Sequence, residues 1–107
     1  MEDVRIDIGT FGDYLREEWL EPLSLSPYRL AKDLGISSTA LSKILSGKNA
    51  MSVDTCWRLA RYFGVSRNYF ARMQDEYIAR RNEEDFEKRV EGLSVYEWAE
   101  TKADLTP

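Results

Sequence analysis

The sequence has no histidine and only one cysteine, Cys56, among its 107 residues. Histidine is the most frequent catalytic acid or base and a frequent metal ligand, so its absence removes the usual catalytic and metal-binding constellations. We therefore expect no enzyme activity, no metal and no cofactor. A single cysteine forms no disulfide within the chain, which fits a reducing cytoplasm.

Long hydrophobic runs are also missing from the chain. No stretch approaches the roughly 20 apolar residues that a membrane-spanning helix needs. The first residues, MEDVRIDIG, are acidic and contain no apolar run, so we expect no signal peptide and a cytoplasmic protein without membrane contact. Hydrophobic residues still make up 43% of the chain, which is enough for the core of one small domain.

Positive charge is scarce overall, since the net charge is −4, but it is unevenly distributed. Residues 24–73 carry eight basic and two acidic side chains. Residues 1–23 carry two basic and seven acidic ones, and residues 74–107 carry five and ten. Charges act over only about 8–10 Å at physiological salt, so a basic middle attracts phosphate despite the global sum. An ordinary solvated surface would show the same pattern.

The stretch 26–48, SPYRLAKDLGISSTALSKILSGK, predicts two short helices joined by a tight turn. Ser26 and Ser37 are good N-caps, and Pro27 stands at the first helical position, where proline is favoured. Gly35 can adopt the positive φ that ends a helix. The apolar residues at helical spacing are expected to be buried: Leu30, Ala31, Leu34, Ile36, Leu41, Ile44 and Leu45. This layout, at about 26–46, is that of a DNA-binding helix-turn-helix.

The rest of the chain is also predicted to be helical, so the expected fold class is all-α. The expected helices run from Thr10 or Gly12 to about Glu21, then over about 27–34, 38–46, 53–63 and 67–89. The apolar face of the first helix includes Tyr14 or Leu15, with Trp19 and Leu20. The apolar faces of the fourth and fifth helices include Cys56, Leu59, Ala60, Phe63, Tyr69, Phe70, Met73 and Tyr77. Pro22 ends the first helix, and Gly64 ends the fourth.

Further serines are the expected N-caps of the later helices. Ser52 caps the fourth helix and Ser66 the fifth, and Ser94, after the helix-breaking Gly92, caps a last short helix bearing Val95, Trp98 and Ala99. The alternating residues at 4–8, VRIDI, form either a short strand or a disordered start. We expect an N-terminal segment over 1–11, a helix-turn-helix domain over 12–78 and a charged helical extension over 79–107.

Several motifs around the predicted turn are specific. They are LREEWLEPL at 15–23, LSPYRLAKDLG at 25–35, GKNAMS at 47–52, DTCWRLARYFG at 54–64 and MQDEY at 73–77. Over about 12–78 the chain resembles the HigA antitoxin family, also called VapI-like, within the lambda-repressor-like or XRE helix-turn-helix group. Many members of that family begin with His-Pro-Gly-Glu, where this chain has Gly9-Thr10-Phe11-Gly12-Asp13, and residues from about 80 match no family pattern.

The resemblance implies a five-helix lambda-repressor-like domain and two roles. The protein would bind a palindromic operator on double-stranded DNA as a homodimer and repress its own operon on the bacterial nucleoid. It would also neutralise a HigB-type RNase toxin, with an acidic flank facing a basic partner. Two alternatives are a stand-alone XRE-family regulator without a toxin and a protein-interaction module that has lost DNA binding. The absence of arginine on the expected recognition helix motivates the last alternative.

Two sets of side chains are the candidate DNA contacts. The expected base contacts lie on the second helix of the motif: Ser38, Thr39, Ala40, Ser42 and Lys43. The expected phosphate contacts flank it: Ser26, Tyr28, Arg29, Lys48 and Asn49. Helical spacing predicts that the aromatic residues are core or dimer contacts and do not stack on bases: Trp19, Trp57, Tyr62, Phe63, Tyr69 and Phe70. Trp98, in an acidic tail, needs a partner in its own core, the other subunit or a bound protein.

Overall fold

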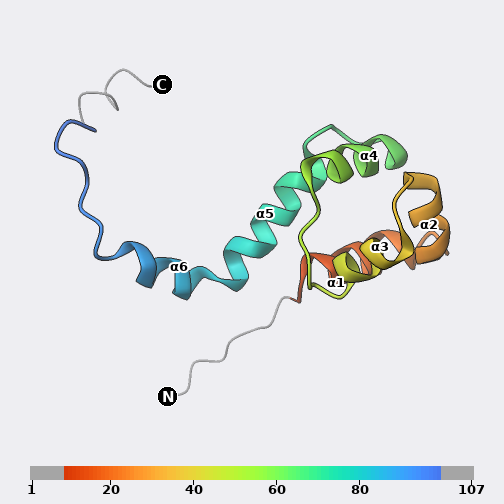
Figure 1. The fold of residues 1–107 in the computed structure, drawn as a ribbon, viewed down its shortest axis with the longest axis horizontal. Helices are drawn as coiled ribbons and strands as arrows, with labels where there is room; N and C mark the ends of the chain where they lie inside the picture. Colours follow the sequence, from red (N-terminus) through yellow and green to blue (C-terminus); the bar gives the residue numbers. More distant parts are fainter. Residues whose placement is uncertain (1–8, 100–107) are drawn as a thin grey trace, which may run out of the picture.

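The computed structural model describes residues 9–99, and all regular structure in that range is helical (Figure 1). The elements are α1 (Phe11–Leu15), η1 (Arg16–Leu20), α2 (Pro27–Leu34), α3 (Ser38–Leu45), α4 (Val53–Phe63), α5 (Tyr69–Arg81) and α6 (Glu83–Val90). The all-α prediction is confirmed. The segment 4–8 lies outside the described residues. No helix within 9–99 has the length and apolar character that crossing a membrane requires.

Side-chain caps start the first helices where the sequence predicts them. Thr10, Ser26, Ser37 and Ser52 each accept a hydrogen bond from the backbone N–H three residues ahead. Thr10, not Gly12, therefore opens the first helix. α2 ends at Gly35 with φ of 74°, and α3 follows after a short turn. The helix-turn-helix prediction is confirmed.

The first helix changes its winding halfway. Residues Arg16–Leu20 form a π-helix, in which the Glu21 N–H donates to the Arg16 carbonyl at 2.9 Å, five residues back. Leu15 and Leu20 are both fully buried although they stand five positions apart. The wider turn brings both side chains to the same face. Spacing rules based on 3.6 residues per turn do not predict this segment.

The long helix predicted over 67–89 is two helices. It begins at Tyr69, not after Ser66, and the residue before it, Asn68, makes no side-chain cap. At Asn82 the chain leaves helical geometry, with φ of −114° and ψ of 14°. The Asn82 side-chain amide donates to the Ile78 carbonyl at 2.8 Å, so it competes with the backbone for that acceptor. The predictions of one continuous helix and of a Ser66 cap were wrong.

The short helix predicted after Ser94 does not include Val95 or Trp98. Residues 93–96 adopt no regular structure, a turn follows at 97–98, and Ala99 is helical. The Val95 and Trp98 side chains are exposed, so Trp98 packs on no core in the described part of the chain. The sequence beyond Ala99 lies outside the described residues.

The core lies between α1, η1 and the four helices α2 to α5. All of the apolar residues predicted to be buried in α2, α3 and the inner face of α4 are buried, and Ile36 and Phe63 pack against them. α6 has no buried residue and extends from the end of α5 (Figure 1). The buried apolar side chains are Phe11, Leu15, Leu20, Leu30, Ala31, Leu34, Leu41, Ile44, Leu45, Met51, Cys56, Leu59, Ala60 and Phe70.

The aromatic residues divide into two groups. Trp19 packs on Phe63 and Phe70 with ring centroids 4.7 and 5.2 Å apart, as the spacing predicts. Trp57 and Tyr62 are 45% and 38% exposed, so they are not core residues, and their alternative role as dimer contacts stays a prediction. The Arg67 guanidinium lies 4.8 Å from the centre of the Trp57 ring, and the Tyr62 hydroxyl donates to Asp33 at 2.6 Å. Both rings are at the edge of the α4 face and not within it.

Candidate nucleic-acid interface

α3 has two distinct faces. Leu41, Ile44 and Leu45 are buried against the core. The five expected base contacts, Ser38, Thr39, Ala40, Ser42 and Lys43, are all exposed. Ser37 caps this helix by accepting from the Ala40 N–H at 3.0 Å, so the cap hydroxyl and the base-contact side chains do not compete. The exposed face carries hydroxyls, one methyl group and one ammonium group. Most of these side chains are short, so the helix is narrow enough to enter a major groove.

The five expected phosphate contacts are also exposed, at the start of α2 and in the loop after α3. The Ser26 hydroxyl accepts from the Arg29 N–H at 3.1 Å and keeps its own proton for a further acceptor. The Tyr28 side chain points into solvent. The Lys48 and Asn49 backbone N–H groups both donate to the Lys43 carbonyl, which folds this loop back onto the end of α3.

Arg29 already has a partner in the free protein. Its guanidinium pairs with Asp33 one turn later, at 2.8 Å, and this contact raises the pKa of Arg29 above its usual value. Asp33 also accepts from the Tyr62 hydroxyl, and these two hydrogen bonds lower the pKa of the Asp33 carboxyl. A phosphate at Arg29 must therefore share the guanidinium with Asp33.

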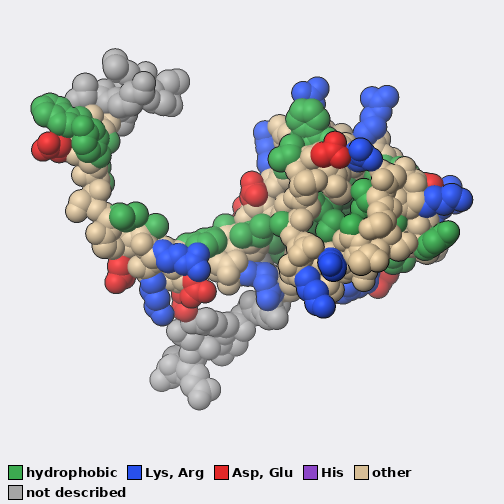
Figure 2. Space-filling view, viewed as in Figure 1, with side chains coloured by type: hydrophobic (Ala, Val, Ile, Leu, Met, Phe, Trp, Pro, Cys, Tyr) green, Lys and Arg blue, Asp and Glu red, His purple; other side chains and the backbone are tan. Residues whose placement is uncertain are grey.

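Basic side chains outnumber acidic ones over the body formed by α1 to α5 in the view of Figure 2, whereas α6 carries both signs. The basic residues of the segment 24–73 thus lie on the compact body of α1 to α5 and not on α6. This arrangement favours phosphate over other ligands at short range.

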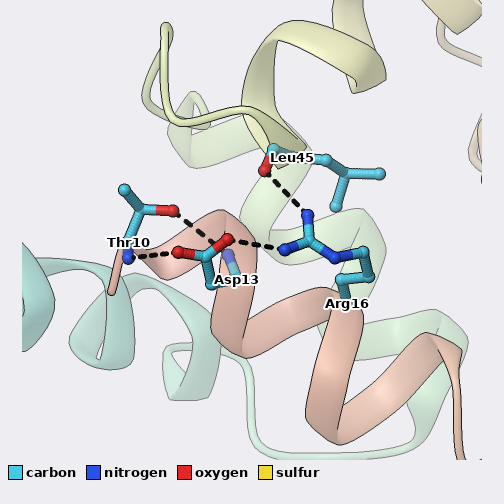
Figure 3. A network of polar contacts seen from close by, with 4 residues as sticks. All are labelled: Thr10, Asp13, Arg16 and Leu45. Atoms are coloured by element: carbon cyan, nitrogen blue, oxygen red, sulfur yellow. Dashed lines mark hydrogen bonds and ion pairs between the residues drawn. The ribbon is translucent and has the colours of Figure 1, made fainter. Parts of the chain in front are cut away.

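The end of α3 is held by residues of α1 and η1 (Figure 3). The Asp13 carboxylate accepts from the Thr10 N–H at 2.9 Å and pairs with the Arg16 guanidinium at 2.6 Å. These contacts, the Thr10 N–H foremost, lower the pKa of Asp13, so it is ionised at neutral pH. Arg16 in turn donates to the Leu45 carbonyl at 3.4 Å, at the last residue of α3.

Gly12 lets α1 approach α3 closely. A Cβ at this position would lie 2.4 Å from the Leu45 carbonyl oxygen and 2.5 Å from that of Ile44. Real Cβ atoms do not come so near to backbone oxygens, so any side chain here would displace the end of α3.

The loop after α3 is fastened to α5 by one buried side chain. Gln74 accepts from the Met51 N–H at 2.7 Å and donates to the Met51 carbonyl at 3.1 Å. Every buried side-chain nitrogen and oxygen of the described residues has a partner. The loop that carries Lys48 and Asn49 therefore has a fixed end.

Sequence reasoning missed the residues that support the site. The Thr10–Asp13 spacing is a capping box and was readable from the sequence. Gly12 and Gln74 gave no local signal, because their roles depend on elements distant in sequence. Within residues 9–99, no group of three or more histidine, cysteine, aspartate or glutamate side chains is placed to hold a metal.

Comparisons with known proteins place this interface in a family. A helix-turn-helix family model matches residues 17–70, half of the chain. Virulence-associated protein I of Dichelobacter nodosus is 38% identical over 74 residues, which cover 69% of this chain and 68% of that protein. All ten candidate DNA contacts lie within residues 17–70, the range that the family model matches.

Solved structures agree with this match. The Pseudomonas aeruginosa antitoxin HigA, solved with the higBA promoter, is 30% identical with a TM-score of 0.65, over 80% of this chain and 98% of that one. An addiction module antidote protein of the HigA family from Coxiella burnetii is 28% identical with a TM-score of 0.73, over 85% and 100%. These findings confirm the resemblance read from the sequence. The chain belongs to the XRE-type helix-turn-helix family, and its structural neighbours include HigA antitoxins.

Proposed function

We propose that this protein is a sequence-specific DNA-binding repressor and the antitoxin of a HigBA-type module. The observation that carries the proposal is the exposed polar face of α3, set on a buried face that fixes its orientation, in a chain of this family. The neighbour from Pseudomonas aeruginosa, an antitoxin studied with the higBA promoter, supports it. The protein acts by binding and not by catalysis.

In this proposal α3 enters the major groove. The hydroxyls of Ser38, Thr39 and Ser42 donate to or accept from base edges, and Lys43 donates to guanine O6 or N7. The Ala40 methyl group packs against a thymine methyl. These contacts carry the sequence preference, because they alone touch the bases.

Phosphate contacts fix the register of the protein on the duplex. At the N-terminus of α2, Pro27 has no N–H and the Arg29 N–H is bonded to the Ser26 hydroxyl. The first turn therefore offers a phosphate the Tyr28 N–H and the positive end of the helix dipole. Arg29, Lys48 and Asn49 supply further donors on either side of α3. Arg29 is expected to turn from Asp33 towards phosphate when DNA is bound.

We further propose that two copies act together in the bacterial cytoplasm, on the nucleoid. One module of this size buries little surface, so useful affinity needs two half-sites. A two-fold axis would place the recognition helices about 34 Å apart, facing a palindromic operator. A HigB-type RNase toxin is the proposed second partner, attracted by the acidic flanks of the chain.

A gel-shift experiment tests the DNA part of the proposal. The probe is the DNA immediately upstream of the protein's own gene, and random DNA of equal length is the competitor at physiological salt. Retardation of the upstream probe that survives the competitor supports an autoregulatory repressor. Equal binding to both would contradict the sequence preference, and binding to neither would favour the protein-interaction module.

Co-expression with the neighbouring reading frame tests the antitoxin part. We expect the neighbour to arrest growth alone and to form a stable complex with this protein. A neighbour that is neither toxic nor bound, together with a specific gel shift, would show a stand-alone regulator.

A further inference from the structure

We infer that Arg16 is a positioning residue for DNA recognition: it holds the end of α3 through the Leu45 carbonyl, so sequence specificity depends on a side chain outside the base-contact face. The inference rests on the proposed DNA binding. It concerns how the recognition helix is oriented, and it extends the site to the first helix of the chain.

α1 and α3 approach each other closely. The Gly12 position faces the carbonyl oxygens of Ile44 and Leu45 at a distance that leaves no room for a Cβ. The backbone of α1 is therefore in direct contact with the last turn of α3. A movement of α1 relative to α3 cannot occur without moving that turn, since packed interiors have no free volume to absorb it.

The C-terminal end of α3 carries partial negative charge. The last carbonyls of a helix lack backbone partners and carry partial negative charge, so a cation there is stabilising. Arg16 supplies that cation to the Leu45 carbonyl at 3.4 Å. Ser46 and Gly47 supply only uncharged donors to the same turn. Their backbone N–H groups donate to the Ser42 and Ile44 carbonyls, and the Ser46 hydroxyl donates to the Lys43 carbonyl at 3.1 Å.

Arg16 is itself held in place by α1. Its second guanidinium nitrogen pairs with Asp13 at 2.6 Å, and Asp13 is fixed by the Thr10 N–H at 2.9 Å. Both charged side chains are partly shielded from water, at 39% and 37% exposed. The chain Thr10–Asp13–Arg16 thus presents a preset donor to α3 and does not depend on a freely rotating arginine (Figure 3).

The consequence concerns Lys43, two positions before Leu45. Base contacts tolerate misplacement of only about 0.5 Å, whereas phosphate contacts by flexible side chains adapt to larger movements. Releasing the end of α3 should therefore weaken binding to the operator more than binding to random DNA. A residue that merely stabilised the fold would leave the ratio of the two unchanged well below the melting temperature.

The experiment compares Arg16→Ala with the matched control Arg80→Ala. Arg80 forms a similar ion pair, with Glu76 at 3.1 Å, but on α5, so its loss removes the same charge without touching α3. Kd is measured for the upstream DNA and for random DNA at several salt concentrations, at a temperature where circular dichroism shows each variant folded. We expect Arg16→Ala to lower the operator preference about tenfold, the size of one good base contact. Arg80→Ala should leave the preference unchanged.

Two further variants keep the test decisive if Arg16→Ala is poorly folded. Arg16→Lys retains a cation for the Leu45 carbonyl and should recover part of the preference. Gly12→Ala should lower it without removing any charge. In all three variants the salt dependence should match that of the wild type, because none of these residues is assigned to phosphate.

The outcomes separate cleanly. Equal operator preference in Arg16→Ala and Arg80→Ala overturns the inference and leaves the proposed function intact. A salt dependence that weakens by about one phosphate contact in Arg16→Ala overturns it too, since Arg16 would then bind DNA itself. A wild-type protein without operator preference overturns the proposed function, and the inference with it.

Discussion

Leu41 and Lys43 lie two positions apart on α3 and face opposite ways. Leu41 is 1% exposed, so Leu41→Ala should lower the free energy of unfolding by about 2–5 kcal/mol. Lys43 is exposed, so Lys43→Ala should leave unfolding unchanged and weaken operator binding by about 1–3 kcal/mol. Urea unfolding and gel shifts on the same two variants measure both effects. Equal losses of stability would mean that the faces of α3 are assigned wrongly.

Tyr14 provides a prediction at alkaline pH. Its hydroxyl hydrogen-bonds the Tyr69 hydroxyl at 2.8 Å and accepts from the Trp19 ring N–H at 3.1 Å. Burial, followed by the bond to Tyr69, raises the pKa of Tyr14 to about 12. The folded state thus favours the protonated phenol, and this stabilisation is complete below the unfolded pKa of 10.0 and lost as pH rises towards 12.

The measurement is a titration of tyrosinate absorbance in the folded protein. The Tyr14 phenol should ionise well above the ordinary tyrosine pKa of 10.0, and Tyr14→Phe should remove that late step. A late step that persists in Tyr14→Phe would assign it to another tyrosine.

Individual side chains were predictable where helical spacing decides between inside and outside. All ten candidate DNA contacts are exposed, as the sequence indicates, although their contacts with DNA stay a prediction. For Trp57 and Tyr62 the structure excludes the core and leaves the dimer contact as a prediction. Spacing could not decide between the two, because it gives the direction of a side chain but not where the neighbouring helix ends. The pairing of Arg29 with Asp33, four residues apart, follows a spacing rule and was not considered.

At the scale of elements, the bond between Gln74 and Met51 fixes the loop between α3 and α4. Gln74→Ala leaves a buried N–H and a buried carbonyl without partners and should cost about 1–3 kcal/mol for each. It should also weaken DNA binding, because the loop carries Lys48 and Asn49. Thermal unfolding and gel shifts measure the two effects.

Gln74→Glu is the matched variant, since a carboxylate accepts from the Met51 N–H but does not donate to the Met51 carbonyl. Gln74→Glu should lose only the bond to the Met51 carbonyl, which is a smaller loss of hydrogen bonding than in Gln74→Ala. Burying the carboxylate charge at neutral pH adds a separate cost in stability. An unchanged melting temperature in both variants would show that water replaces the side chain.

Helix starts were predictable and later helix boundaries were not. Serine and threonine caps and Gly35 are local signals, and they placed α1 to α4. The break at Asn82 depends on a competition between a side-chain amide and the backbone for one carbonyl. The two hydrogen bonds differ little in free energy, so core contacts would normally decide whether the helix continues. α6 has no buried residue and so has no such contacts.

At the scale of the whole molecule, the core and the α6 extension are separable. The buried apolar side chains lie between Phe11 and Phe70, and α6 adds none. A chain ending after Asn82 should therefore unfold at the same temperature as the full chain. A chain ending after Ala71 should not fold, because it lacks Gln74 and the Tyr77 ring that packs on Phe11.

Thermal unfolding at several protein concentrations tests this prediction. A full chain that loses stability on dilution, beside a less stable shorter chain that does not, would contradict it, because α6 would then contribute to contacts between copies. The proposed domain limit near residue 78 rests on the same separation. The sequence indicated this limit because the residues after it are mostly charged and show no apolar stripe at helical spacing.

The π-helical turn has a consequence for how this chain tolerates changes of length. Deleting one residue from an α-helix rotates everything downstream by about 100°, which would turn the buried side outwards. Here Leu15 and Leu20 share a buried side only because the turn between them holds one residue more than an α-turn. Removing Glu17 or Glu18, both exposed, would bring the leucines to ordinary four-residue spacing on the same side. Among related chains, a single-residue gap is therefore expected at this point rather than elsewhere in the helical body.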